Sequence, residues 1–230
     1  MVIGNGLVAN AFKKNFSNSP DYIIFASGVS NSSENNLIIF EREKKLLENY
    51  VNVNKKLIYF SGVNVYDKSL INSPYVIHKK KMENIVKKAQ SYNIFRLGLV
   101  LGITNNPNTL ANFLYTNILE NKYFEVWEKA TRNIIDIDDV FLLVVSILQS
   151  KKYTNKIINI ANPNSTLVIN IIKIFENILK KNANFLKINT GDAYEIETTI
   201  VKKFALKLPI NFNELYVDKV IKKYYQKIEL

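Results

Sequence analysis

The chain has 230 residues, of which 47% are apolar and 22% are charged, as in an ordinary globular protein. It contains 31 basic and 20 acidic residues, so the formal net charge is +11. It has no cysteine and one histidine, which excludes a disulfide framework, a cysteine-ligated metal, a thiol nucleophile and a multi-histidine centre. We therefore expect one large compact unit and predict no metal site.

The excess of positive charge is compatible with nucleic acid, an anionic membrane or a polyphosphate ligand. Most lysines come as scattered pairs, as on a solvated surface, and they cluster only at 79–81 and 87–88. We find no RNA-recognition, helix-turn-helix or zinc motif, so we predict no nucleic-acid partner. No apolar run approaches the ~20 residues of a membrane span, and no signal peptide is evident. We expect a cytoplasmic protein without a membrane span.

In chain order, short apolar strands alternate with longer amphipathic stretches, which is typical of an α/β fold. Strands are predicted at 2–4, 22–25, 56–61, 93–101, 133–137, 156–160 and 185–188. Helices are predicted at 7–16, 40–50, 75–91, 109–121, 138–149, 166–180 and 212–227. Asp138 and Asp139 open one of these helices and suit the positive end of its dipole.

The first motif that carries chemistry is a glycine-rich turn between the first strand and the first helix. Gly4-Asn5-Gly6-Leu7-Val8-Ala9 fits the pattern G-x-G-x-x-G/A. The first glycine permits a tight turn, the second lets a pyrophosphate approach the backbone, and the helix N-terminus faces the anion. The alternative is a glycine turn in an unrelated α/β protein. No acidic residue follows the second strand, where such a unit holds the adenosine ribose.

The second motif is a tyrosine and a lysine on one helical face, in Ser73-Pro74-Tyr75-Val76-Ile77-His78-Lys79. A lysine ammonium beside a phenol favours the phenolate, which can exchange a proton with a sugar hydroxyl while a nicotinamide exchanges a hydride. Upstream, a strand ends at Ser61 and is followed by Gly62, Asn64 and Tyr66. Because the Tyr-x-x-x-Lys spacing is frequent by chance in a chain with 13 tyrosines, the order of these motifs matters more than the pair.

In that order, the motifs resemble the extended short-chain dehydrogenase/reductase family, the NAD-dependent epimerases and dehydratases of nucleotide sugars. Further segments are similar to this family: 95–102 (FRLGLVLG), 132–140 (RNIIDIDDV) and 157–161 (IINIA). The resemblance covers residues 1 to about 180. It implies a Rossmann-like parallel sheet with helices on both faces and a small C-terminal substrate lobe. Residues 1–105 would form the core, and residues 106–230 would return strands to it and form the lobe.

The resemblance also implies a cofactor, NAD or NADP, and a nucleotide-sugar substrate, with surface-polysaccharide synthesis as the pathway and a homodimer as one possible assembly. The catalytic residues it implies are Tyr75 as acid–base residue, Lys79 as the residue that tunes it, and Ser61. The cofactor-binding residues it implies are Gly4, Asn5, Gly6, Leu7, Val8, Ala26, Ser27, Gly28, Lys79 and Leu99. The substrate-binding residues it implies are Asn64, Asn112 and Arg132. A guanidinium at Arg132 suits a diphosphate, and a surface or interface ion pair is the alternative.

The chain departs from the family pattern at three places. The family's catalytic hydroxyl usually lies four residues before the tyrosine that Tyr66 matches, and that place here is Gly62; either Ser61 serves instead or the hydroxyl is absent. Ala26-Ser27-Gly28 resembles the segment after the family's fourth strand, so about two strands with their helices, which hold adenine and its ribose, are missing. Leu99 stands where many members carry asparagine.

Two hypotheses follow. The first is an NAD(P)-dependent epimerase or 4-ketoreductase; a dehydratase is less expected because no acidic pair lies near residues 62–64. The second is a catalytically decayed scaffold that binds a dinucleotide or sugar nucleotide without turnover. Outside the motif roles, we expect His78 to be half-buried or at the surface, and Trp127 with the Tyr123–Phe124 pair to lie in the core of the lobe.

Overall fold

A parallel sheet forms the centre of the computed structural model, which describes residues 1–191 and 193–226. Its five strands have the order β1-β2-β3-β4-β9, and every neighbouring pair is parallel. The strands are β1 (Val2–Ile3), β2 (Tyr22–Phe25), β3 (Lys56–Gly62), β4 (Tyr92–Leu97) and β9 (Lys156–Ile160). This sheet confirms the predicted α/β, Rossmann-like architecture.

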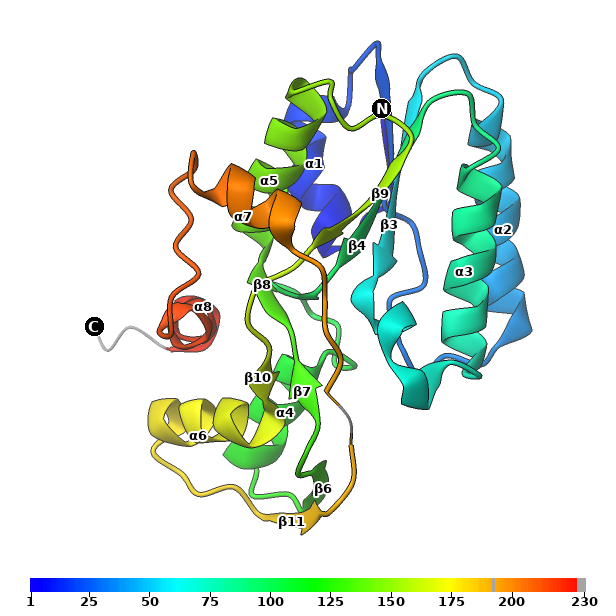
Figure 1. Cartoon of the computed structure of the whole chain (residues 1–230). Helices are drawn as coiled ribbons and strands as arrows, with labels where there is room; N and C mark the ends of the chain where they lie inside the picture. Colours follow the sequence, from blue (N-terminus) through cyan, green and yellow to red (C-terminus); the bar gives the residue numbers. More distant parts are fainter. Residues whose placement is uncertain (192, 227–230) are drawn as a thin grey trace.

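Helices cover both faces of the sheet (Figure 1). One face carries α2 (Leu37–Val51) and α3 (Pro74–Val86), and the other carries α1 (Leu7–Phe16), α5 (Ile137–Gln149) and α7 (Thr199–Ala205). Successive side chains of β3 point to opposite faces of the sheet, so this one strand contributes to both helix–sheet interfaces. Leu57 and Tyr59 pack with Leu47 and Met82 in one apolar cluster. Ile58 and Phe60 of the same strand lie in the other cluster, with Phe12 of α1 and Val140 of α5.

A lobe of small strand pairs and helices occupies the lower part of Figure 1. The pairs are β5 (Leu99–Leu101) with β8 (Ile134–Asp136), β7 (Thr131–Arg132) with β10 (Thr166–Leu167), and β6 (Phe124–Trp127) with β11 (Phe185–Ile188). The helices are α4 (Leu110–Leu119), α6 (Val168–Leu179) and α8 (Tyr216–Tyr225). Leu114, Phe175 and Ile221 bring the three helices into one buried cluster.

Helix α8 is fastened to the start of α5 by hydrogen bonds and ion pairs. The Tyr216 hydroxyl donates to Asp139 at 2.6 Å, and Lys223 contacts Asp136 at 2.7 Å and Asp138 at 2.6 Å. The N-cap of α5 is Asp136, whose side chain accepts from the Asp138 N–H. Asp138 and Asp139, which we expected at the helix opening, lie in its first turn, where their charge still suits the helix dipole.

The element boundaries differ from the prediction where the chain turns early. Helix α3 ends at Val86, not at residue 91, because bonds of the tighter i to i+3 type at Lys88 and Ala89 turn the chain toward β4. The predicted helix 212–227 begins at Tyr216, and Lys227 lies outside the described residues. Strand β6 and helix α7 were not predicted. Among residues 1–191 and 193–226, no helix has the length and apolar character needed to cross a membrane.

Candidate active site

The glycine-rich turn lies at the carboxyl end of β1 and leads into α1. Gly4 has φ +123°, and a Cβ on it would lie 2.4 Å from the Ala26 carbonyl oxygen, so only glycine fits. A Cβ on Gly6 would meet nothing within 4 Å. Helix α1 has no side-chain cap, so the N–H groups of its first turn remain available to an anion.

The other predicted residues of this turn are held by the helix that follows. The Asn5 side-chain oxygen accepts from Lys13 at 3.0 Å, and the Asn5 carbonyl accepts from Asn10 at 3.2 Å. Leu7 and Val8 pack against the apolar cluster of α1 and α5. Asn5 therefore shapes the turn, whereas Leu7 and Val8 contribute their backbone to its surface.

The loop after β2 lies beside this turn, because β2 pairs directly with β1. The Ala26 N–H donates to the Ile3 carbonyl at 2.8 Å, and Arg42 holds Ser27 through its hydroxyl at 3.2 Å and its carbonyl at 2.9 Å. A Cβ on Gly28 would lie 2.8 Å from the Lys79 ammonium nitrogen. Within the described residues β1 ends the sheet, consistent with a shortened nucleotide-binding half.

Tyr75 and Lys79 share one face of α3, as the i, i+4 spacing predicts. Ser73 caps the helix by accepting from the Val76 N–H at 3.2 Å, and Pro74 occupies its first turn. The Lys79 nitrogen lies 5.7 Å from the centre of the Tyr75 ring, and both side chains are buried. In the part of the chain that the structure describes, the Tyr75 hydroxyl makes no hydrogen bond.

Lys79 is held by a buried carboxylate that the sequence analysis missed. Glu43 of α2 is fully buried and accepts four hydrogen bonds: from the Val29 N–H at 2.7 Å, Tyr59 at 2.7 Å, His78 at 2.9 Å and Lys79 at 3.4 Å. The Lys79 nitrogen also lies 3.2 Å from the Tyr59 hydroxyl. Helix α3, strand β3 and the loop after β2 therefore converge on a single side chain of α2.

The charges in this cluster compensate one another. Burial alone would raise the pKa of Glu43, but the Lys79 ammonium and the bonds from His78, Val29 and Tyr59 hold that pKa at about 2. Burial, reinforced by Glu43, raises the pKa of the Tyr59 phenol well above its ordinary value. Glu43 is thus a carboxylate and Tyr59 a neutral donor at neutral pH.

His78 belongs to this cluster, which corrects our expectation of a surface or half-buried residue. Its side chain is only 5% exposed and stacks on Phe40 with ring centres 4.5 Å apart. The signal that could have found the cluster lies on the predicted helix 40–50. Phe40, Glu43 and Leu47 follow the spacing of a buried helical stripe, and a carboxylate in such a stripe needs buried partners.

Strand β3 ends in front of Tyr75, at Gly62. A Cβ on Gly62 would lie 3.7 Å from the Tyr75 hydroxyl and 2.6 Å from the Asn64 side-chain oxygen. Ser61, one residue earlier, is buried, and its hydroxyl has no hydrogen-bond partner among the described residues. The position that faces Tyr75 is therefore residue 62, and Ser61 makes no hydrogen bond to Tyr75.

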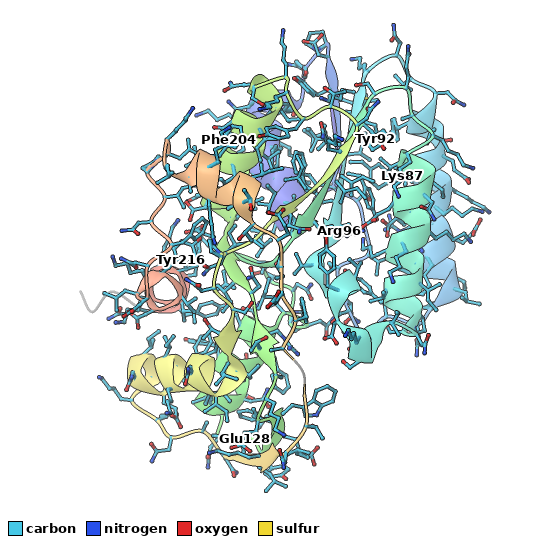
Figure 2. All side chains as sticks on the ribbon, viewed as in Figure 1. Lys87, Tyr92, Arg96, Glu128, Phe204 and Tyr216 are labelled. Carbon is cyan, nitrogen blue, oxygen red and sulfur yellow. The ribbon has the colours of Figure 1, made fainter. Side chains whose placement is uncertain are left out.

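A second ion pair supports this end of β3. Arg96 of β4 donates to both oxygens of Glu83, at 2.9 and 2.6 Å, and to the Tyr66 hydroxyl at 2.7 Å. Tyr66 in turn donates to Asn159 of β9 at 3.0 Å. Figure 2 shows Tyr92 and Arg96 toward opposite ends of β4, with Arg96 toward the lobe. These bonds fasten α3 and the turn after Gly62 to the carboxyl end of the sheet.

The remaining predicted residues lie in the lobe. The Asn112 amide donates to the carbonyls of Thr104 and Asn106 at 3.1 and 2.8 Å, and its oxygen accepts from Tyr225 at 2.6 Å. Arg132 is half-buried in β7 and donates to the Thr131 carbonyl at 2.8 Å. Leu99 is partly buried in β5.

The aromatic residues expected in the core of the lobe divide into two groups. Phe124 is buried, as predicted, and stacks with Phe185 at 5.8 Å between ring centres. Trp127 and Tyr123 are 48% and 59% exposed, which contradicts the prediction. Alternation along β6 explains Trp127, because Phe124 and Val126 point inward and Glu125 and Trp127 point outward.

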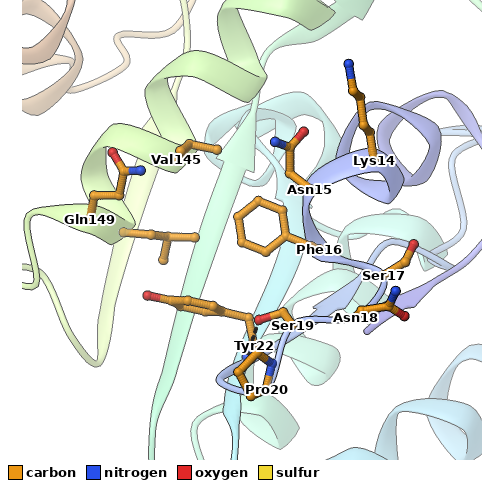
Figure 3. Close-up of a pocket in the computed structure, with 11 residues that line it drawn as sticks. Lys14, Asn15, Phe16, Ser17, Asn18, Ser19, Pro20, Tyr22, Val145 and Gln149 are labelled. Atoms are coloured by element: carbon orange, nitrogen blue, oxygen red, sulfur yellow. Dashed lines mark hydrogen bonds between the residues drawn. The ribbon is translucent and has the colours of Figure 1, made fainter.

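A separate hollow lies at the amino end of the sheet, between α1, the start of β2 and α5 (Figure 3). Phe16, Tyr22, Val145 and Gln149 are among the residues that line it. Tyr22 begins β2, whereas the loop of the candidate site follows the last residue of this strand. The hollow therefore lies at the opposite end of the sheet from Tyr75 and Lys79.

Comparison with known proteins bears on both the fold and the site. A model of the NAD-dependent epimerase/dehydratase family matches residues 2–161. No curated protein sequence matches the chain.

Several solved structures resemble the chain over most of its length. UDP-glucuronic acid 4-epimerase from Bacillus cereus, in complex with UDP-glucuronic acid and NAD, is 17% identical, with a TM-score of 0.66 and coverage of 97% of this chain and 87% of that one. dTDP-glucose 4,6-dehydratase from Bacillus anthracis, in complex with NAD, is 15% identical, with a TM-score of 0.65 and coverage of 96% and 78%. RMD from Pseudomonas aeruginosa, complexed with NADPH, is 12% identical, with a TM-score of 0.65 and coverage of 97% and 88%. These similarities support the fold.

Proposed function

Because the chain belongs to the NAD-dependent epimerase/dehydratase family, we propose that it is an NAD- or NADP-dependent epimerase or 4-ketoreductase of a nucleotide sugar. The observation that carries this proposal is the buried Tyr75–Lys79 pair, placed beside Gly28 at the carboxyl end of the sheet. Surface-polysaccharide synthesis, a cytoplasmic location and a homodimer stay predictions. So does the division into a cofactor-binding core (1–105) and a segment that forms the substrate lobe (106–230).

The residues present fit the phosphates and the nicotinamide half of the cofactor. Gly6 leaves open space above an uncapped helix N-terminus, which suits a pyrophosphate. Gly28 brings no side chain that would crowd the Lys79 ammonium, from which a Cβ would lie only 2.8 Å, and this ammonium would donate to the ribose hydroxyls. Ala26 and Ser27 would line the path between these two places. The adenosine half has less support, because β1 ends the sheet within the described residues.

The chemistry then divides between cofactor and chain. The chemistry that the cofactor would supply is the exchange of a hydride with a sugar carbon. Tyr75 takes the proton from the hydroxyl on that carbon, or gives it back in the reverse direction. Glu43 keeps the Lys79 ammonium beside the Tyr75 ring without leaving a buried charge unpaired.

The substrate would lie between the sheet and the lobe. Arg132 remains the proposed partner of the nucleotide diphosphate, since a guanidinium can hold two phosphate oxygens. Asn112 is engaged by Thr104, Asn106 and Tyr225, which supports a role in shaping the loop before α4.

The second candidate function is binding without turnover on a decayed scaffold. Gly62 favours it, because residue 62 faces Tyr75 and brings no hydroxyl. The short nucleotide half favours it as well.

A cofactor screen tests the first step of the proposal. Thermal unfolding is measured with NAD, NADH, NADP and NADPH, each at saturation. A ligand at a hundred times its Kd adds about 2.7 kcal/mol to the free energy of unfolding, which is readily detected. We expect one pair of cofactors to raise the unfolding temperature. No shift with any of the four would favour the decayed scaffold.

Turnover tests the second step. The protein is incubated with the cofactor that binds and with UDP-glucose, UDP-glucuronic acid or UDP-N-acetylglucosamine, and the products are separated by chromatography. We expect Tyr75→Phe to lower kcat at least roughly 100-fold without unfolding the chain, because it removes the proton carrier. The matched control is Tyr123→Phe, whose side chain is 59% exposed and remote in sequence. A Tyr75→Phe variant with normal kcat would contradict the mechanism.

A further inference from the structure

The backbone at Gly62 does not require glycine. Its φ of −123° and ψ of 149° are ordinary extended values that any residue adopts. With Asn64 as it lies here, a Cβ on residue 62 would be 2.6 Å from the Asn64 side-chain oxygen and 3.4 Å from the carbon that bears it, so the Asn64 side chain would have to move. The Asn64 carboxamide thus fills the space that a side chain on residue 62 would otherwise use.

That same space lies next to the Tyr75 hydroxyl, which is 3.7 Å from the Cβ position of Gly62. The Asn64 oxygen is buried and has no hydrogen-bond partner among residues 1–191 and 193–226. Tyr75 also makes no hydrogen bond within this part of the chain. Buried polar atoms are nearly always paired, so an exception beside a reactive phenol indicates a partner that arrives with the ligand.

Ser61 does not offer the same geometry. Neighbouring residues of a strand point in opposite directions, so Ser61 and Gly62 do not project toward the same point. The Ser61 hydroxyl is buried and makes no hydrogen bond to Tyr75. The geometry therefore favours Asn64 over Ser61 as the second polar group at the reacting atom.

Resting on the proposed function, we propose that Asn64 is a catalytic residue whose carboxamide binds the sugar oxygen that exchanges its proton with Tyr75. A carboxamide offers one acceptor and two donors from a single side chain. Its N–H would donate to the reacting oxygen, both while that oxygen belongs to a hydroxyl and after it has become a carbonyl, and its oxygen would accept from a neighbouring hydroxyl of the sugar. The hydroxyl proton would pass to the Tyr75 oxygen while the hydride on the same carbon would go to the cofactor, and Asn64 itself would exchange no atom.

This arrangement predicts an unusual relation between two substitutions. Asn64→Ala removes the carboxamide, and Gly62→Ser alone introduces a Cβ into occupied space. In the double variant the space is free, and the new serine hydroxyl projects toward Tyr75. The double variant should therefore be more active than either single variant. A purely structural role of Asn64 would instead predict normal activity for Asn64→Asp, which keeps the shape of the side chain.

The experiment measures kcat and KM with the nucleotide sugar that the wild type converts. We expect Asn64→Ala to lower kcat at least roughly 100-fold, the scale of one lost transition-state hydrogen-bond donor. Asn64→Asp keeps the shape but loses the N–H donors, so it should also lose activity. Gly62→Ser/Asn64→Ala should recover at least roughly tenfold over Asn64→Ala. Asn84→Ala, on the exposed side of α3, is the control and should keep wild-type kcat.

The outcomes separate this inference from the function on which it rests. An active wild type whose Asn64→Ala or Asn64→Asp variant keeps normal kcat overturns the role of Asn64 and leaves the proposed function standing. A wild type that converts none of the sugars overturns the proposed function and this role with it. Thermal unfolding of every variant identifies one that fails to fold; Asn64→Ser then replaces Asn64→Ala, with the same two expectations.

Discussion

The two ends of the proposed cofactor site differ in composition: side chains form the end at Lys79, and backbone forms the end at the glycine-rich turn. Around Lys79, side chains from α3 and β3 and the backbone N–H of Val29 converge on the buried carboxylate of Glu43. Around the glycine turn, the site consists of backbone, and Gly4 and Gly6 contribute only the absence of a Cβ. The first end depends on paired charges, whereas the second depends on conformation and open space. Substitutions should therefore affect the first end through lost partners and the second through steric fit.

The largest effect on stability is expected from Glu43→Leu. This change leaves Lys79 and His78 buried without their acceptor, and breaking a buried pair costs about 3–5 kcal/mol. The unfolding temperature should fall by roughly 10 °C. The matched control is Glu48→Gln on the same helix, whose side chain is 47% exposed and whose loss should cost less than about 0.5 kcal/mol. Equal stability of the two variants would contradict the buried network.

The second effect is a dependence of stability on pH. The pKa of Glu43 is lowered from 4.5 to about 2 on folding, so its contribution is present above pH 4.5 and is lost as the pH falls toward 2. The wild type should be more stable than Glu43→Gln at about pH 6, and the gap, on the order of 3 kcal/mol, should close between these two pH values. Denaturant titrations of both proteins measure the gap. A gap that stays constant down to pH 2 would show that the charge of Glu43 is not its source.

The third effect concerns the other end of the site, at Gly4. Gly4→Ala forces a Cβ onto a residue with φ +123° and into contact with the Ala26 carbonyl at 2.4 Å. The strain of such a backbone alone costs about 1–3 kcal/mol, and the loop after β2 must also shift. Chemical denaturation should show the lower stability. A variant as stable as the wild type would mean that the turn relaxes without cost.

The smallest effect on stability is expected two residues further on. Gly6→Ala places a Cβ where no atom lies within 4 Å, so the cost should stay below about 1 kcal/mol, mainly from a poorer helix cap. The same methyl group would occupy the space proposed for the pyrophosphate. The Kd for the bound cofactor should therefore rise at least roughly tenfold, as measured by calorimetric titration. An unchanged Kd would place the phosphates elsewhere.

The local pattern of apolar and polar residues was sufficient to predict most strands of the sheet and most of the helices that cover it. Leu7–Phe16, Tyr22–Phe25 and Lys156–Ile160 are found at their predicted bounds because each is apolar on the face that its neighbours bury. Strand β6 escaped prediction because its four residues become a strand only by pairing with β11, about sixty residues later. Helix α3 was predicted too long because its last residues are good helix formers that the turn into β4 overrides.

The part of the candidate site that lies within the two sequence motifs could be predicted from the sequence. The spacing of Tyr75 and Lys79 and the glycines of the first turn identified residues that the fold does bring to one edge of the sheet. Glu43 was not identified, since its partners lie up to 36 residues away and no local pattern connects them. The relation of Gly62 to Asn64 also needed coordinates, because it depends on how the chain turns after β3.

The two edge strands of the sheet, β1 and β9, affect the tendency of the protein to aggregate at high concentration. An unpaired strand can recruit a strand from another molecule, which is a common route to aggregation. Strand β1 offers only two residues for such pairing. Strand β9 is longer, but the segment before α7 lies against it, where Asn159 donates to the Glu197 carbonyl at 2.9 Å. Strand β1 is protected because it is short, and strand β9 is protected because the segment before α7 covers it. Detaching that segment would therefore expose the edge strand that is more prone to intermolecular pairing.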